Sequence, residues 1–204
     1  VLLIDNLDSF TLNIAHAIAG LGREVLIYKA RDGAPEVIWD ADACVEFTRR
    51  FQPTHIVLGP GPGEPADSPL TMELARSALS GKITTPILGI CLGHQALGLA
   101  AGMELIRSPN GPVHGAPRMC LHNQTGLFST LQPPSLFTRY NSLCIASMEN
   151  GPYIETAHEA NTKMVMGIQH PDLQIHGIQF HPESVGSQEG LELLKNFLML
   201  EADA

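Results

Sequence analysis

The stretch PILGICLGHQALG, residues 86–98, joins a short apolar run to a cysteine flanked by glycines. PILGI has the continuous apolar character of a strand buried on both faces, and LGHQALG has helical character. Between them Gly89, Cys91 and Gly93 form a G-x-C-x-G pattern, the cysteine form of the sharp turn that lifts a nucleophile out of a parallel sheet. The stretch therefore predicts an α/β sheet with Cys91 at the carboxyl end of a strand, the edge at which such sheets bind ligands.

The rest of the first half alternates strand-like and helix-like segments. Apolar runs typical of buried strands cover residues 1–5, 24–29, 54–59 and 85–90. Helical spacing of apolar residues covers 9–22, 40–51, 70–80 and 92–102. This alternation predicts an open, mostly parallel sheet flanked by helices. Ser9 is the expected N-cap of the first helix, and the prolines and glycines of residues 60–69 exclude helix and strand there.

The second half has a different pattern, with short apolar runs separated by turn residues. These runs cover residues 118–122, 140–146, 155–159, 164–170 and 175–180. They predict a small antiparallel sheet added to the parallel one. A helix is expected over 187–200, with Leu191, Leu194, Phe197 and Leu198 on one face. Because no linker or low-complexity tract interrupts the chain, we expect residues 1–204 to form a single domain.

Composition excludes several classes of protein. The chain has 204 residues, 12 Lys and Arg, and a net charge of -9, which argues against binding to nucleic acid or to anionic membranes. It has no apolar run of about 18 residues and no basic leader, so we expect no membrane helix and no signal peptide. Four widely spaced cysteines without a C-x-x-C pair indicate reduced thiols and no metal site. Together these features favour a cytoplasmic location; the chain does not begin with Met, so it can be part of a longer one.

Cys91 has two possible interpretations. Most free cysteines are small buried hydrophobic residues, and we expect this of Cys44, Cys120 and Cys144. At Cys91 the turn favours catalysis, because the N-terminus of the following helix stabilises a thiolate and the Leu92 N–H points to where an oxyanion would form. Such a nucleophile needs a histidine to move protons and a group to orient that histidine.

Two His-Pro-acid triplets within residues 167–184 can supply this histidine: His170 with Asp172, and His181 with Glu183. Since proline keeps the preceding residue extended, each carboxylate lies on the same face as its imidazole. The geometry alone does not choose between them.

The segment GIQHPD is nearly repeated as GIQFHPES, with Phe180 inserted before the second histidine. This insertion reverses the strand parity, so that relative to its own GIQ each histidine faces the opposite way and only one is expected to face Cys91. The first triplet leads into PDLQ, a turn that fits the exposed tip of a hairpin and explains Asp172 by itself.

Five motifs together resemble the class I glutamine amidotransferases, in the branch that aminates chorismate. The resemblance covers essentially the whole chain and rests on DNLDSFTLN (5–13), LGPGPGEP (58–65), GICLGHQALG (89–98), RYNSL (139–143) and QFHPES (179–184). It implies that Cys91 is the nucleophile and that His181 and Glu183 complete the triad. The motif QFHPES thus decides between the two triplets.

The resemblance also implies a glutamine site without a cofactor. A rigid loop would offer backbone groups to the amide and the oxyanion, Gln95 would face the same pocket, and backbone contacts of Ser142 and Leu143 would hold the α-amino and α-carboxylate groups. The residues concerned are Gly61, Pro62, Gly63, Leu92, Gln95, Ser142 and Leu143. Two residues outside the triad differ from the usual motifs of the family. Ala116 replaces the lysine of the usual HGK, and Asn141 replaces the histidine of the usual RYHSL.

The implied function is that of a glutaminase that hydrolyses L-glutamine and passes ammonia to a chorismate-binding synthase subunit or fused domain. The product would be anthranilate or aminodeoxychorismate, and Asn141 also fits the related phenazine-pathway enzymes. Two alternatives differ in class. One is a stand-alone cysteine hydrolase of γ-glutamyl bonds, and the other is a non-catalytic regulatory subunit on the same fold.

Overall fold

The computed structural model describes residues 1–30 and 38–201 and contains one large sheet. Within these residues nine strands pair in the order β2-β1-β3-β4-β11-β10-β9-β6-β7, and β5 and β8 form a separate antiparallel pair. The strands are β1 (Leu2–Asp5), β2 (Leu26–Lys29), β3 (Ile56–Leu58), β4 (Ile87–Ile90), β5 (Leu105–Arg107), β6 (Ala116–His122), β7 (Ser135–Arg139), β8 (Leu143–Ile145), β9 (Ile154–Glu159), β10 (Val165–Gln169) and β11 (Ile175–Ile178). The helices are α1 (Thr11–Gly20), α2 (Ala41–Phe51), α3 (Pro69–Leu79), α4 (Leu92–Ala100) and α5 (Gly190–Leu198), with 3₁₀ turns η1 (Pro65–Asp67) and η2 (Gly126–Phe128).

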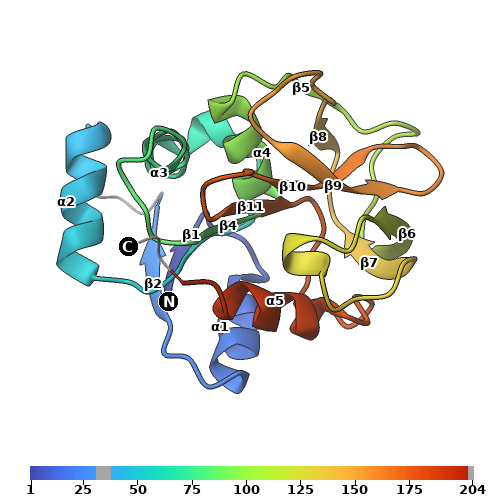
Figure 1. The fold of residues 1–204 in the computed structure, drawn as a ribbon, viewed down its shortest axis with the longest axis horizontal. Helices are drawn as coiled ribbons and strands as arrows, with labels where there is room; N and C mark the ends of the chain where they lie inside the picture. Colours follow the sequence, from blue (N-terminus) through green and yellow to red (C-terminus); the bar gives the residue numbers. More distant parts are fainter. Residues whose placement is uncertain (31–37, 202–204) are drawn as a thin grey trace.

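Helices cover both faces of the parallel half. Figure 1 shows α1 and α5 on one side of the sheet and α3 and α4 on the other. Successive strand residues point to opposite faces. Leu3 and Val57 accordingly belong to the core cluster that includes α1 and α5. Ile4 and Leu58 belong to the cluster that includes α2, α3 and α4.

The order of the strands determines what meets at the carboxyl edge of the sheet. Strand β4 lies between β3 and β11, and it pairs in parallel with both of them. The segments that follow β3, β4 and β11 therefore leave the sheet at the same edge. They contain Gly61, Cys91 and His181, which are far apart in the sequence.

The antiparallel half begins with the hairpin of β10 and β11, which turns through residues 170–174. Strands β9, β6 and β7 extend the same sheet beyond it, while β5 and β8 stand apart. The predicted fold class is confirmed: an open sheet with helices beside its parallel strands and a small antiparallel sheet. The membership of the small sheet differs from the prediction, because most of the runs expected there extend the large sheet and only residues 140–146 contribute to the separate pair.

The structure corrects several details. Ser9 is not the N-cap of α1, because Phe10 occupies that position and makes no side-chain cap. The segment 60–69 contains the 3₁₀ turn η1, and Glu64 and Asp67 form a capping box around it. In α5, Leu191 is 56% exposed and Leu193 is buried in its place. Strands β5 and β7 were not predicted.

All four cysteines are free and buried. In the part of the chain that the structure describes, no helix is long and apolar enough to cross a membrane.

Candidate active site

Cys91 occupies a strained turn between β4 and α4. Its backbone angles are φ 53° and ψ −101°, in a region that side chains with a Cβ rarely adopt. Its N–H donates to the carbonyl of Ile178 at 2.9 Å, which ties the turn to the end of β11. A Cβ on Gly89 would lie 2.6 Å from the carbonyl carbon of Gly93, and a Cβ on Gly93 would clash with the Leu58 carbonyl. Both glycines are therefore required for the predicted turn.

His181 and Glu183 form a buried pair at the same edge of the sheet. The distance from His181 Nδ1 to Glu183 Oε1 is 2.7 Å, and the two side chains are 1% and 0% exposed. The His181 N–H donates to the carbonyl of Thr138 at 2.9 Å, and the Ser187 hydroxyl donates to the carbonyl of His181 at 2.6 Å. These bonds hold the backbone from which the imidazole projects.

The pKa of His181 reflects its neighbours. Burial by itself lowers this pKa, but the interactions of the ring with Cys91 and Glu183 outweigh burial and raise it to about 10. A raised pKa favours the protonated imidazole. A cationic imidazole beside a thiol favours the thiolate, as in other Cys-His pairs.

The other triplet lies elsewhere and is arranged differently. His170 Nδ1 accepts hydrogen bonds from the backbone N–H groups of Asp172 and Leu173, at 3.1 and 3.0 Å. His170 follows β10, which runs antiparallel to β11, so it lies at the amino edge of the parallel strands. Cys91 lies at the carboxyl edge. The structure therefore brings together Cys91, His181 and Glu183, and it leaves His170 in the hairpin turn.

A cavity of about 280 Å³ opens beside Cys91. It contains Gly61, Pro62, Gly63, Gln95, Ser142 and Leu143, all of which the sequence placed in the candidate substrate site, together with Tyr140 and Asn141. Leu92 is buried at the start of α4 and does not line this cavity with its side chain. Its expected contribution is the backbone N–H.

Hydrogen bonds of Asn6 hold the loop of Gly61, Pro62 and Gly63 in place. The Asn6 amide Nδ2 donates to the carbonyl of Gly59 at 2.9 Å, and its Oδ1 accepts from the hydroxyls of Ser68 and Thr71 at 2.6 and 2.8 Å. A Cβ on Gly61 would lie 2.6 Å from the Cβ of Asn6. The motifs DNLDSFTLN and LGPGPGEP thus meet in space, with the first holding the second beside Cys91.

Other residues at the site were not predicted. The rings of Phe10 and Tyr140 flank His181 edge-on, with centroids 5.7 and 5.0 Å from the imidazole. The amide Nε2 of Gln179 donates to Cys91 Sγ at 3.6 Å. Phe10, Tyr140 and Gln179 lie inside the motifs that carry the resemblance, which was the available signal.

His94 takes no part in this arrangement. Its ring is fully buried, and a Cβ on Gly177 would lie 2.7 Å from its Nδ1. Burial lowers the pKa of His94 to about 3, so the ring stays neutral. It serves as part of the packing between α4 and β11.

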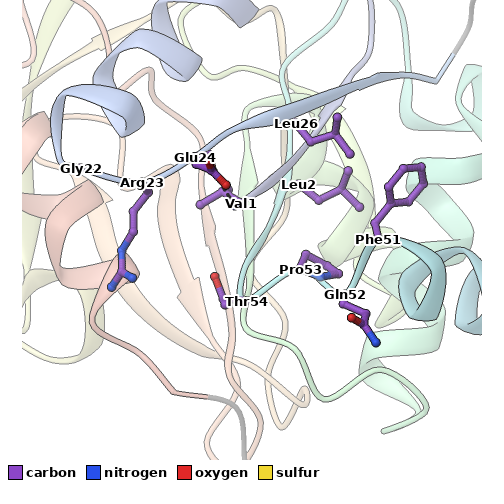
Figure 2. Close-up of a pocket in the computed structure, with 10 residues that line it drawn as sticks. All are labelled: Val1, Leu2, Gly22, Arg23, Glu24, Leu26, Phe51, Gln52, Pro53 and Thr54. Atoms are coloured by element: carbon purple, nitrogen blue, oxygen red, sulfur yellow. Dashed lines mark hydrogen bonds between the residues drawn. The ribbon is translucent and has the colours of Figure 1, made fainter.

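A larger cavity, of about 410 Å³, lies at the opposite edge of the sheet. Figure 2 shows the residues around it, among them Val1, Arg23, Glu24 and Thr54. They come from the beginnings of β1, β2 and β3. The lining contains no cysteine or histidine, so it offers no counterpart to Cys91.

Comparison with known proteins agrees with the resemblance seen in the sequence motifs. The sequence pattern of the family described as "Glutamine amidotransferase class-I" matches residues 2–200. The chain is 36% identical over 198 residues to the anthranilate synthase component 2 of Azospirillum brasilense, covering 97% of this chain and 94% of that one. It is 37% identical over 198 residues to the aminodeoxychorismate synthase component 2 of Escherichia coli, covering 97% and 98%.

Some relatives are longer. The chain is 36% identical over 201 residues to the bifunctional protein TrpGD of Thermotoga maritima, and it spans 98% of its own length but only 32% of that protein. Among solved structures, a glutamine amidotransferase from Thermotoga maritima superposes with a TM-score of 0.72 at 15% identity, covering 97% of this chain and 95% of that one. At that identity the superposition supports the fold alone.

Proposed function

Because this chain belongs to the class I glutamine amidotransferase family, we propose that Cys91, His181 and Glu183 are the catalytic triad with which it hydrolyses L-glutamine. The observation that carries the proposal is the position of His181. Its Nδ1 is bonded to Glu183 Oε1 at 2.7 Å, and it follows β11, which runs parallel to the strand that ends at Cys91. A nucleophile, a proton carrier and an orienting carboxylate are the three parts that this chemistry needs.

In the proposed reaction the Cys91 thiolate attacks the side-chain amide carbon of glutamine. The negative charge moves to the amide oxygen, where the N–H of Leu92 and the backbone of the Gly61–Gly63 loop stabilise it. His181 gives its proton to the departing nitrogen, which leaves as ammonia. A γ-glutamyl thioester remains on Cys91. Water then attacks this thioester, His181 takes a proton from it, and glutamate and the thiolate are released.

Backbone geometry supports a role for Leu143 in holding glutamine. The Leu143 carbonyl accepts hydrogen bonds from Gln95 Nε2 and Asn141 Nδ2, both at 2.8 Å. Its backbone groups therefore point away from β5, toward the cavity, since alternate residues of an antiparallel strand do so. We assign the Leu143 N–H, with the neighbouring Ser142, to the substrate α-carboxylate. Gln95 lines the same pocket as a polar neighbour of the substrate.

The acceptor of the ammonia is the second part of the proposal. The relatives named above are components of anthranilate synthase and aminodeoxychorismate synthase. We propose that this chain likewise delivers ammonia to a chorismate-binding synthase, as a separate subunit or as part of a fused chain. Delivery must exclude water, because ammonia that reaches bulk solvent at neutral pH is protonated and no longer nucleophilic.

Reactivity of Cys91 is expected to depend on the synthase. The rate of Cys91 alkylation by a glutamine-like alkylating agent should change several-fold when the synthase is added. It should change again when chorismate is added to the complex. L-glutamine should block the labelling. Mass spectrometry of the Cys91 peptide measures this rate, and the buried Cys120 provides an internal reference.

Two results would contradict the partnership. If the labelling rate is the same with and without synthase and chorismate, Cys91 belongs to a stand-alone hydrolase. If Cys91 is never labelled and glutamine never binds, a regulatory subunit is the better description.

Where the partnership holds, the amine that the active complex forms from chorismate distinguishes anthranilate synthesis from aminodeoxychorismate synthesis.

A further inference from the structure

Gln179 is fully buried beside the nucleophile, and the proposed reaction leaves it without a role. It lies two residues before His181, just beyond the end of β11. Its Nε2 is 3.6 Å from Cys91 Sγ, and its Oε1 is 3.1 Å from the Nε2 of Gln95. Its own N–H donates to the Met166 carbonyl at 3.0 Å, which holds the backbone to β10. Gln179 therefore connects the nucleophile to the candidate substrate residue Gln95.

The orientation of each amide in this connection follows from its partners. A backbone carbonyl can only accept, so the end of Gln95 that lies 2.8 Å from the Leu143 carbonyl must be the NH₂ group. The same NH₂ group lies 3.1 Å from Gln179, which must therefore present its oxygen there. The remaining end of Gln179, its NH₂ group, faces Cys91 Sγ.

A second chain of bonds holds the Leu143 carbonyl in place. Arg139 can only donate, and its Nε donates to Asn141 Oδ1 at 2.9 Å. The Nδ2 of Asn141 then donates to the Leu143 carbonyl at 2.8 Å. Arg139 is itself 1% exposed and paired with Glu159 at 2.7 Å. A buried ion pair thus anchors the acceptor that orients Gln95 and, through it, Gln179.

The side-chain NH₂ group of Gln179 can donate to sulfur but cannot accept from it. A protonated thiol gains little from such a neighbour, because sulfur is a weak acceptor. A thiolate gains a charge-assisted hydrogen bond inside a buried site, where that bond is stronger than in water. The contact therefore favours the charged form of Cys91 over the neutral one.

We propose that Gln179 is a positioning residue that stabilises the Cys91 thiolate, with its donor end directed at the sulfur by the Leu143 carbonyl through Gln95. The inference rests on Cys91 being the nucleophile. It adds a second source of thiolate stabilisation beside the protonated His181, and it connects the substrate pocket to the charge of the nucleophile.

The test is the pH profile of Cys91 alkylation by iodoacetamide in the full chain. In Gln179→Met, which keeps the size but loses the donor, the pH of half-maximal alkylation should rise by about one unit, the size expected for one lost bond to a charged group. The ratio kcat/KM for glutamine should fall by about tenfold at neutral pH. Gln179→Glu keeps the shape and replaces the donor with an acceptor, so it should shift the midpoint at least as far.

The near-repeat of the sequence supplies a matched control. Gln169 occupies the same place in the first GIQ as Gln179 in the second, but it lies at the far end of β10 from Cys91. Gln169→Met should leave the alkylation midpoint unchanged. Thermal unfolding of each variant shows that the comparison is made on folded protein, and Gln179→Glu provides the measurement should Gln179→Met not fold.

The outcomes separate this inference from the proposed function. An unchanged midpoint in Gln179→Met or Gln179→Glu, with wild-type Cys91 still protected by glutamine, overturns the role of Gln179 alone. A midpoint that moves equally in Gln169→Met also overturns it, since the effect is then not local. If glutamine never protects Cys91 in the wild type, the proposed function fails instead.

Discussion

Replacing Cys91 with serine is expected to abolish glutamine-dependent amination by the complex and to leave ammonia-dependent amination by the synthase intact. A serine hydroxyl stays protonated where a cysteine forms a thiolate, so the attack on the amide is lost. We expect the glutaminase rate to fall by about four orders of magnitude or more, as when other covalent nucleophiles are removed. Amine formation from chorismate, measured separately with glutamine and with ammonium salt, gives both rates.

The other cysteines are the controls for this substitution. Burial raises the pKa of Cys120 to about 12, and that of Cys44 to about 12, so both remain protonated thiols. Burial also raises the pKa of Cys144. Cys120→Ser and Cys144→Ser should therefore keep glutaminase activity. Loss of activity in either folded control, together with its survival in Cys91→Ser, would show that the nucleophile has been misassigned.

The two histidines of the near-repeat should differ sharply when each is changed to asparagine. His181→Asn removes the proton carrier and should reduce glutaminase turnover by about three orders of magnitude. His170→Asn should stay within several-fold of wild type, because the His170 ring accepts hydrogen bonds from its own turn and packs against Tyr153, away from Cys91. Glu183→Gln should cost less than His181→Asn, since it orients the imidazole without moving the proton itself.

Steady-state assays with L-glutamine, on proteins whose thermal unfolding confirms the fold, rank these variants. The opposite order of the two histidine variants is incompatible with the proposed triad. A Glu183→Gln variant slower than His181→Asn would instead mean that the carboxylate does more than orient the ring.

The turn at Cys91 could be predicted because its causes are local. A buried apolar run, two glycines and a following helix are all visible in residues 86–98. The strain at Cys91 and the close approach of Gly93 to β3 explain why those residue types are needed. The hairpin around residues 170–174 was likewise predictable from its Pro-Asp turn.

The choice between His170 and His181 shows what local reasoning missed. Strand parity concerns the two faces of a sheet, but these histidines differ in the edge at which they lie. Because β10 and β11 run in opposite directions, the residues that follow them leave the sheet at opposite edges. The predicted hairpin implies that the two histidines lie at opposite edges, and the parallel pairing of β11 with β4 shows that His181 shares the edge of Cys91.

Other features depend on contacts between distant segments. The ring of Tyr140 packs against His181, and Asn141 bonds to Arg139 and to the Leu143 carbonyl; spacing along the chain indicates neither arrangement. Strand β5 is only three residues long and forms by pairing with β8. At α1, Asp5 and Asp8 accept the N–H groups of Leu7 and Phe10, a local alternative to the cap expected from Ser9.

The central claim is that glutamine is hydrolysed through a covalent intermediate on Cys91. It is tested most directly by quenching the complex in acid during turnover of isotopically labelled L-glutamine, then digesting the protein and locating any bound glutamyl group by mass spectrometry. The proposed mechanism predicts one γ-glutamyl group on the Cys91 peptide, none on the peptides of Cys44, Cys120 and Cys144, and none in Cys91→Ser. A glutamyl group on any other residue, or glutamate release by Cys91→Ser at the wild-type rate, would contradict it.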